Sequence, residues 1–343
     1  MISISLLALF STLWLSLIKC DTECPIVNSF EDRRKDKSSL RLVQYNVEWL
    51  FIDYYSGMDC PGNGCTWHSV SDAQTHLSYV ANTIKNLQPD IINFCEVEGC
   101  DELNQLKEQL DSTYNSYLKK GTDTGTGQNV GMLTRIDPLI NLYRSEEKIA
   151  YPIYGTKCGA TNITGTSGVS KHYITEFNLG NMNVAMIGAH LLAIPTDPPR
   201  CVQREAQAQV LQNVVSSYIE KNYEVILIGD MNDYDSEILD LNSDKPTSRV
   251  LDIMKGLDGQ KKGKYELINI AYRINQSERY SDWWDSDNNC NTSSQKDLSM
   301  IDHILVTPNI DKKIVAAYIY HGYKEYCGKW DSDHWPVVVD FKF

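Results

Sequence analysis

The feature of this sequence that most restricts its fold is a series of short apolar runs, each followed at once by a polar residue. The polar residues that end these runs are, in chain order, Asn46, Glu96, His190 and Asp230. Short apolar runs bounded by polar residues are typical of buried β-strands. Two more strands are predicted over residues 300–306 and 335–339, so predicted strands recur along most of the chain.

Two of these strands follow segments in which apolar residues recur at helical spacing. The first segment follows Asp72, its predicted cap, and carries Leu77, Val80, Ile84 and Leu87. The second follows Arg204 and carries Val210, Val214, Tyr218 and Ile219. Helices that precede strands, with strands throughout, predict an α/β (α+β) fold in which helices cover sheets.

No repeat, low-complexity tract or linker divides the chain, which predicts a single domain over residues 38–343 after an N-terminal extension at 21–37. Residues 1–20 are predicted to be a secretory signal peptide, because the sequence is apolar or small from Met1 to Ile18 and lysine first occurs at Lys19. No basic residue precedes this run, so an uncleaved signal anchor remains an alternative. The expected location is outside the cell.

The cysteines agree with export. Ten are present, and loss of Cys20 with the signal peptide leaves an odd number, so at least one thiol is free or paired between chains. The expected bridges are Cys60–Cys65 and Cys158–Cys201, while Cys95 lies in an apolar run and suits a buried thiol. Three sequons for N-glycosylation begin at Asn162, Asn275 and Asn291.

The charge balance restricts how a nucleic acid could be bound. The chain has 45 acidic and 32 basic side chains, a net charge of −13. Binding of nucleic acid through bulk positive charge needs lysine and arginine facing the phosphates, which this composition disfavours. A polyanionic substrate must therefore be met locally, most simply by a metal ion.

Polar residues at the ends of neighbouring strands converge on one edge of a sheet, where open α/β folds place their sites. The strongest motif is Ser332-Asp333-His334 before the last strand, and the others are Asp230 with Asn232, Glu96, Asn46, His190 and Asp302. Together and in this order they resemble the endonuclease/exonuclease/phosphatase superfamily, the deoxyribonuclease I-like fold. The resemblance implies two packed mixed β-sheets flanked by helices, a four-layer sandwich. It also implies a metal-dependent phosphodiesterase, with DNA a better substrate than RNA.

The chain departs from that pattern at two places. Deoxyribonuclease I-type enzymes carry an acid before the strand predicted at 130–134, where this chain has Gln128 or Asn129. His190, followed by Arg204 and Gln207, is more similar to the phosphatase, phosphodiesterase and secreted nuclease branches than to abasic-site nucleases.

The resemblance implies a role for each residue. Oxygen ligands for Mg²⁺ or Mn²⁺ would be Asn46, Glu96 and Asp333, with Ca²⁺ as a structural or supporting ion. Asp302 would orient His334, the base for water, while Asp230 orients the nucleophile or holds a second metal. His190 would contact the phosphate or protonate the leaving oxygen, and Asn232 would donate to the phosphate. Substrate contacts are also expected from Arg204, Tyr280 and Trp283.

Other interpretations stay open. Asp230 and Asn232 could form an Asx turn, His190 could be a core histidine, and Trp283 with Trp284 could cover a small core. The substrate could be sphingomyelin or another small phosphoester, in which case exposed aromatic rings would contact a membrane lipid. The chain could also be a catalytically silent extracellular binding protein with the same fold. No obligate protein partner is evident.

Overall fold

The computed structural model describes residues 23, 24, 26, 30–52, 67, 69–160, 162–257, 263–287, 289–291, 293–323 and 331–343. The predicted signal peptide and the predicted Cys60–Cys65 bridge lie outside the described residues.

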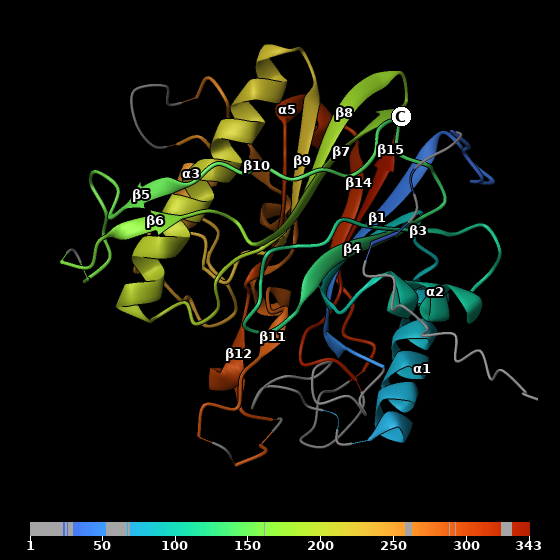
Figure 1. The fold of residues 1–343 in the computed structure, drawn as a ribbon, viewed down its shortest axis with the longest axis horizontal. Coiled ribbons are helices and arrows are strands. Elements are labelled where there is room, and N and C mark those ends of the chain that lie inside the picture. Colours follow the sequence, from blue (N-terminus) through green and yellow to red (C-terminus); the bar gives the residue numbers. More distant parts are fainter. Residues whose placement is uncertain are drawn as a thin grey trace, which may run out of the picture.

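Two mixed sheets form the centre of the molecule (Figure 1). The first has the strand order β14-β15-β1-β2-β4-β3, with bounds β1 Ser39–Leu50, β2 Ile91–Val97, β3 Asn115–Leu118, β4 Asn129–Thr134, β14 Ile314–Ile319 and β15 Val337–Lys342. The second has the order β10-β13-β9-β8-β7, with bounds β7 Lys171–Leu179, β8 Met182–His190, β9 Glu224–Asp230, β10 Ile268–Asn269 and β13 Asp302–Val306. In these two sheets β1 is parallel to β2 and β8 to β9, and the other pairs are antiparallel. The seven predicted strands, including the one at 130–134, and the mixed sheets are confirmed.

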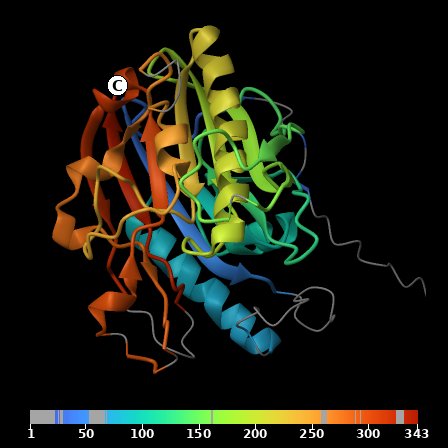
Figure 2. The same cartoon turned by 90° about the vertical axis from the view of Figure 1, so that its left-hand side faces the viewer.

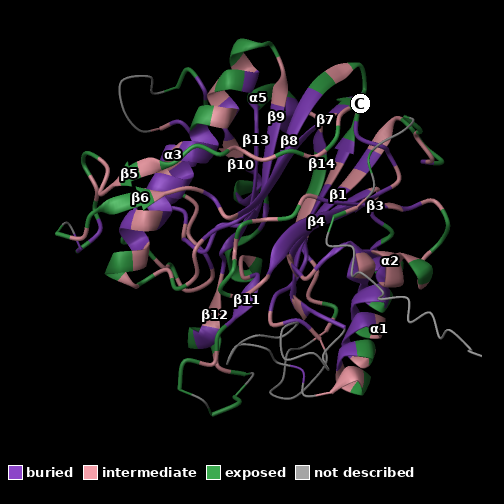
Figure 3. Cartoon of the chain, viewed as in Figure 1, coloured by how far each residue is buried: buried purple, intermediate pink, exposed green. Residues whose placement is uncertain are grey.

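The inner faces of the two sheets pack against each other. Their core joins Leu42 and Val337 of the first sheet to Phe177 and Ile228 of the second, all four being buried. Figure 3 colours these central strands as buried along most of their length. Removal of this apolar surface from water is the main force that holds the sheets together.

Helices cover the outer faces. Helix α1, Val70–Leu87, packs Leu77, Val80 and Ile84 against β1 and β2, and α3, Pro198–Glu220, covers the second sheet (Figures 1 and 2). The predicted cap of α1 is wrong: Ser69 is the cap, and its hydroxyl accepts from the backbone N–H of Asp72. A serine oxygen satisfies a first-turn N–H that would otherwise lack a partner.

The remaining elements are short. They are α2 Cys100–Glu108, α4 Val250–Met254, α5 Pro308–Asp311, the 3₁₀ turns Ile270–Arg273, Gln276–Glu278 and Gln295–Asp297, and the strand pairs β5 Ile149–Tyr151 with β6 Gly165–Ser167 and β11 Asp282–Trp283 with β12 Leu298–Ser299. The β11–β12 pair lies below the two main sheets in Figure 1. No described helix has both the length and the apolar character needed to span a bilayer.

Disulfides tie the periphery to the sheets. The predicted Cys158–Cys201 bridge is confirmed, and Cys95 is a buried free thiol as expected. A Cys24–Cys100 bridge, which spacing did not indicate, fastens the N-terminal extension to the first turn of α2. Arg33 of the same extension donates to both carboxylate oxygens of Asp137, at 2.8 and 2.5 Å.

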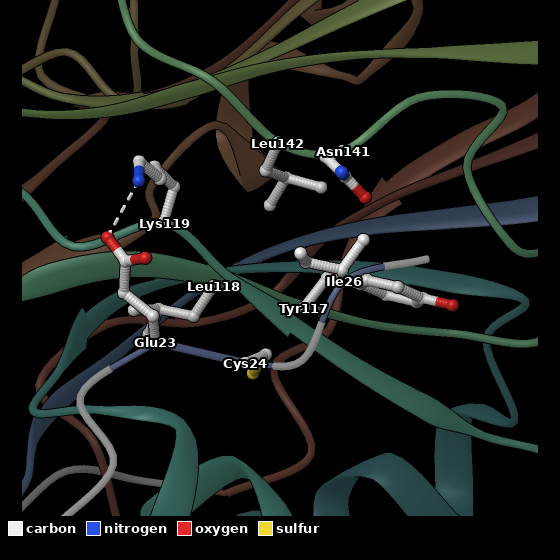
Figure 4. Close-up of a pocket in the computed structure, with 8 residues that line it drawn as sticks. All are labelled: Glu23, Cys24, Ile26, Tyr117, Leu118, Lys119, Asn141 and Leu142. Carbon is white, nitrogen blue, oxygen red and sulfur yellow. Dashed lines mark ion pairs between the residues drawn. The ribbon is translucent and has the colours of Figure 1, made fainter. Parts of the chain in front are cut away.

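The N-terminal extension also lines a pocket of about 250 Å³ against β3 (Figure 4). Lys119 and Glu23, two of its lining residues, form an ion pair of 2.8 Å. The lining contains none of the predicted site residues; its members are Glu23, Cys24, Ile26, Tyr117, Leu118, Lys119, Asn141 and Leu142.

Candidate active site

Strand register brings the predicted site residues to one edge of both sheets. Asn46 of β1 is level with the residue before Glu96 of β2. In the second sheet, His190 at the end of β8 pairs with Asp230 of β9, and Asp230 pairs with Asp302 at the start of β13. Residues far apart in sequence therefore meet because each one ends or begins a strand.

Asp302 and His334 form a close pair. The Nδ1 atom of His334 lies 2.7 Å from Oδ2 of Asp302, and Asp302 also accepts from Gln44 Nε2 and from the Ser281 hydroxyl, each at 2.9 Å. Burial alone would lower the pKa of His334, but the charges of Asp302 and Asp333 outweigh burial and raise its pKa well above the usual value. The carboxylate thus fixes Nδ1 as a proton donor and leaves Nε2 toward the rest of the site.

His190 and Asp230 form a different pair. Nε2 of His190 lies 3.5 Å from Oδ2 of Asp230, and that oxygen also accepts from Asn46 Nδ2 at 3.0 Å. Burial, followed by the charge of Lys171, lowers the pKa of His190 well below its usual value. Burial, followed by the charge of Asp302, raises the pKa of Asp230 to about 8. Both members are therefore mainly neutral at pH 7, and Nδ1 of His190 is a buried atom without a hydrogen-bond partner among the described residues.

Asn232 takes part in both structure and site. Its backbone N–H donates to Oδ1 of Asp230 at 2.9 Å, which is the Asx turn that the sequence left open. Its side-chain amide donates to the carbonyl of Leu191 at 3.3 Å, next to His190. The turn therefore holds Asn232 beside the predicted phosphate contact.

Further acids lie beside these pairs. Glu96 accepts from Asn46 Nδ2 at 3.2 Å and from the backbone N–H of Trp49 at 3.1 Å. The backbone N–H of Asp333 donates to Glu48 Oε2 at 3.0 Å. Burial, followed by the charges of Glu48 and Glu96, raises the pKa of Asp333 well above the usual value.

These residues fit a divalent cation. The acids repel one another, as the raised pKa of Asp333 indicates, and a cation would remove that repulsion. Glu96 and Asp333 offer the hard oxygen atoms that Mg²⁺ and Mn²⁺ prefer. The side-chain amide of Asn46 donates to both Glu96 and Asp230, while its Oδ1 accepts from the backbone N–H of Glu48. In this arrangement Asn46 therefore positions the two carboxylates. A second possible grouping of cation ligands is Asp230, Asp302 and His334, whose ligand atoms lie within 4.8 Å of one another.

The backbone is bent where the strands enter the site. Non-glycine residues adopt positive φ at Glu48 (45°), Trp49 (52°), Glu96 (67°) and Asn232 (49°). Such conformations cost free energy and persist only when surrounding contacts hold them, which makes their concentration at one edge a mark of a functional site.

Sequence reasoning missed several residues of the site. Asp282 of β11 has Oδ1 at 3.4 Å from Nε2 of His334, and burial raises its pKa to about 6. Lys171 lies opposite His190 in the β7–β8 register and donates to Gln128 Oε1 at 3.2 Å. Gln44 supports Asp302 from inside β1. Only Lys171 had a usable signal, since it begins a strand next to a strand that ends in a predicted site residue.

Arg204, a predicted substrate contact, lies inside the protein. Its side chain is fully buried, with Nε 3.2 Å from Oδ2 of Asp233. Its Nη1 and Nη2 atoms donate to backbone carbonyls between Leu192 and Pro195, in the loop after His190. The guanidinium shapes this loop and has its donors engaged within the protein.

The predicted aromatic contacts are also mainly enclosed. Trp283 is 6% exposed and belongs to the core between the sheets, whereas the neighbouring Trp284 is 68% exposed. Tyr280 stacks on His321 with ring centroids 3.8 Å apart and meets Trp335 edge to face. Trp284 is thus the ring of this segment that faces solvent.

A second acidic group lies beyond β11. Asp285, Asp287 and Asp297 have carboxylate oxygens within 4.8 Å of one another, but Lys296 already pairs with Asp287 at 2.5 Å. The predicted supporting role of Ca²⁺ stays a prediction.

A family comparison now bears on this geometry. The model of the endonuclease/exonuclease/phosphatase family matches residues 43–334, a segment that begins in β1 and ends at His334. The chain belongs to the endonuclease/exonuclease/phosphatase family. Members of this family hydrolyse phosphoester bonds and depend on divalent metal ions, which places the protein among the phosphoester hydrolases.

Solved structures agree on the fold. A 3′ phosphatase from Neisseria, bound to a product DNA hairpin, superposes with a TM-score of 0.57 at 14% identity, covering 89% of this chain and 100% of that one. An AP endonuclease from Archaeoglobus fulgidus gives 0.52 at 14% identity, covering 89% and 100%. A family member from Bacteroides thetaiotaomicron gives 0.51 at 19%, covering 89% and 98%. No curated protein matches the sequence.

Proposed function

We propose that this member of the family is a secreted, metal-dependent phosphodiesterase that hydrolyses DNA. The observation that carries the proposal is the 2.7 Å Asp302–His334 pair beside the acids Glu96 and Asp333. A proton-transfer group next to a site for a divalent cation is what attack of water on a phosphodiester requires.

The protein's own residues have separate tasks in this reaction. Mg²⁺ or Mn²⁺, held by Glu96 and Asp333, would supply positive charge for the non-bridging phosphate oxygens. His334, whose Nδ1 proton is held by Asp302, accepts the proton of the attacking water at Nε2 in the fraction of molecules in which that nitrogen is unprotonated. Asp230, which keeps its proton up to about pH 8, can protonate the leaving oxygen. Neutral His190 and the amide of Asn232 contact the phosphate without adding charge.

Two kinds of observation support DNA as the substrate. One similar structure is described as bound to a DNA hairpin and another as an AP endonuclease. The exposed Trp284 offers a face on which a base can stack without sequence preference, at about 1–3 kcal/mol per base. The same ring would suit a lipid surface, so hydrolysis of sphingomyelin is the second candidate.

Secretion is supported by the disulfides Cys24–Cys100 and Cys158–Cys201, since such bridges persist in oxidising compartments. The signal peptide predicted at residues 1–20 supports the same proposal.

The test is incubation of the protein with plasmid DNA, RNA, sphingomyelin and a nucleotide phosphoester, each with Mg²⁺, Mn²⁺ or EDTA. We expect nicking of DNA that EDTA abolishes and that Glu96→Gln reduces at least about a hundredfold. Cleavage of sphingomyelin while DNA stays intact would show that the proposed substrate is wrong and that the proposed phosphodiester hydrolysis is right. Turnover of none of the four would contradict the proposed function and favour a binding protein.

A further inference from the structure

Asp282 is held rigidly at the open face of His334. It begins β11, where it pairs with Ser299 of β12, and it forms an isolated antiparallel bridge with His334. The backbone N–H of Trp283 donates to the carbonyl of Asp333 at 2.9 Å, and that of Trp335 donates to Ser281 at 2.8 Å. Because the segment is bonded on both sides, Asp282 cannot move away from the histidine on its own.

Its carboxylate faces the imidazole nitrogen that Asp302 leaves open. Oδ1 lies 3.4 Å from Nε2 of His334, while Oδ2 accepts from the Ser299 hydroxyl at 3.0 Å. His334 thus has a carboxylate at each nitrogen, with Asp302 at Nδ1 and Asp282 at Nε2. The Asp282 side chain is only 10% exposed, so water screens its charge weakly.

This position has a consequence for any anion. Under the proposed function, on which this inference rests, Nε2 faces the water and the phosphate. A phosphate oxygen that approaches Nε2 meets the negative charge of Asp282, with Asp333 Oδ1 at 3.9 Å from the same nitrogen. Like charges in a poorly solvated site repel strongly, and among the described residues the ion-pair partner of Asp282 is His334 itself, the group that the phosphate would approach.

We propose that Asp282 is an internal competitor of the substrate phosphate: it occupies the acceptor position on Nε2 of His334 and makes phosphate binding conditional on a bound cation. Without a cation, the carboxylate keeps phosphate out of the site. With the acids at Glu96 and Asp333 neutralised, the phosphate has enough attraction to enter beside Asp282. Asp282 is therefore a specificity residue that couples anion binding to cation binding.

The test measures binding of inorganic phosphate in EDTA at pH 8, where Asp282 is ionised, by calorimetry. Asp282→Asn removes the charge and keeps an oxygen for Ser299. We expect this variant to bind phosphate at least about tenfold more tightly than the parent in EDTA. In saturating Mg²⁺ the difference between the two dissociation constants for phosphate should be smaller. With a DNA substrate in Mg²⁺, KM should change more than kcat.

The matched control is Asp252→Asn. Asp252 also accepts from one serine hydroxyl, that of Ser236 at 2.6 Å, but it lies in α4 on the outer side of the second sheet. The Asp252→Asn variant should bind phosphate in EDTA as tightly as the parent. If Asp282→Asn unfolds, as judged by circular dichroism, Asp282→Ser takes its place.

The sign of the effect decides the outcome. Unchanged or weaker phosphate binding by Asp282→Asn in EDTA would overturn the proposal. Loss of phosphate binding only in Mg²⁺ would also overturn it, because Asp282 would then be a cation ligand. The assay needs no turnover, so failure of the proposed function in the substrate panel is distinguishable from failure of this inference.

Discussion

The two histidines of the site are both buried and both lie next to an aspartate, yet their pKa values move in opposite directions. His334 lies 2.7 Å from Asp302 and has a raised pKa, whereas His190 lies 3.5 Å from Asp230 and has a lowered one. Burial lowers both pKa values, so the surrounding charges decide the result: Asp302 and Asp333 raise the pKa of His334, whereas Lys171 lowers that of His190 further. Asp302 accepts three side-chain hydrogen bonds, while Asp230 itself holds a proton up to about pH 8. A buried aspartate raises the pKa of a neighbouring histidine only if its own charge is stabilised.

The largest expected effect separates the two histidines by activity. His334→Ala should reduce kcat on the cleaved substrate by about a thousandfold, because it removes the proton-transfer group. His190→Ala should cost only about tenfold to a hundredfold, because a neutral hydrogen-bonding group is lost. The measurement is steady-state kinetics in Mg²⁺, with circular dichroism as the control for folding. Equal losses would mean that the two imidazoles do not differ in role.

The next largest effect is expected from a substitution of Asp302, the partner of His334. Asp302→Asn should lower the pKa of His334 toward its ordinary value, since the charge of Asp302 is the main influence that raises it. The imidazolium form would then be lost at lower pH than in the parent, which NMR titration of the histidine would detect. We expect kcat to fall by roughly a hundredfold or more because the Nδ1 proton is no longer fixed by a carboxylate. An unchanged pKa of His334 would mean that another acid controls it.

The strands and most of the site could be predicted from sequence because Asn46, Glu96, His190 and Asp230 each end an apolar run. The pattern predicts which side chains lie at the site, but it does not predict which atoms they contact. Those contacts depend on strand register, which pairs Asp230 with Asp302, and register depends on the whole sheet.

Short elements carry no pattern of this kind. Asp282 lies in a strand of two residues, so nothing in the sequence separates it from an exposed acid. Successive side chains of a strand point to opposite faces, so two adjacent tryptophans cannot both point into the core. The sequence did not indicate which of them is buried, and the structure buries Trp283 and exposes Trp284. The Cys24–Cys100 bridge was missed because cysteine spacing does not fix connectivity.

The smallest expected effect is a change in the stability of the protein, and it comes from the neutral pair His190 and Asp230. The pKa of Asp230 is raised from 3.8 to about 8 in the folded protein, first by burial and then by the charge of Asp302. The folded state therefore keeps a proton that the unfolded state releases. The stability from this neutral carboxyl is fully present below about pH 4 and is lost as the pH rises toward 8.

Asp230→Asn stays neutral at every pH and keeps an oxygen for the backbone N–H of Asn232. In EDTA it should melt at about the same temperature as the parent near pH 4 and roughly 2–6 °C higher at pH 8. Calorimetry at several pH values measures the difference, and Asp252→Asn, which removes the same formal charge elsewhere, should show no such trend. A gap in Tm that does not grow with pH would mean that Asp230 is ionised in the folded protein, and the contrast between the two histidines would need another cause.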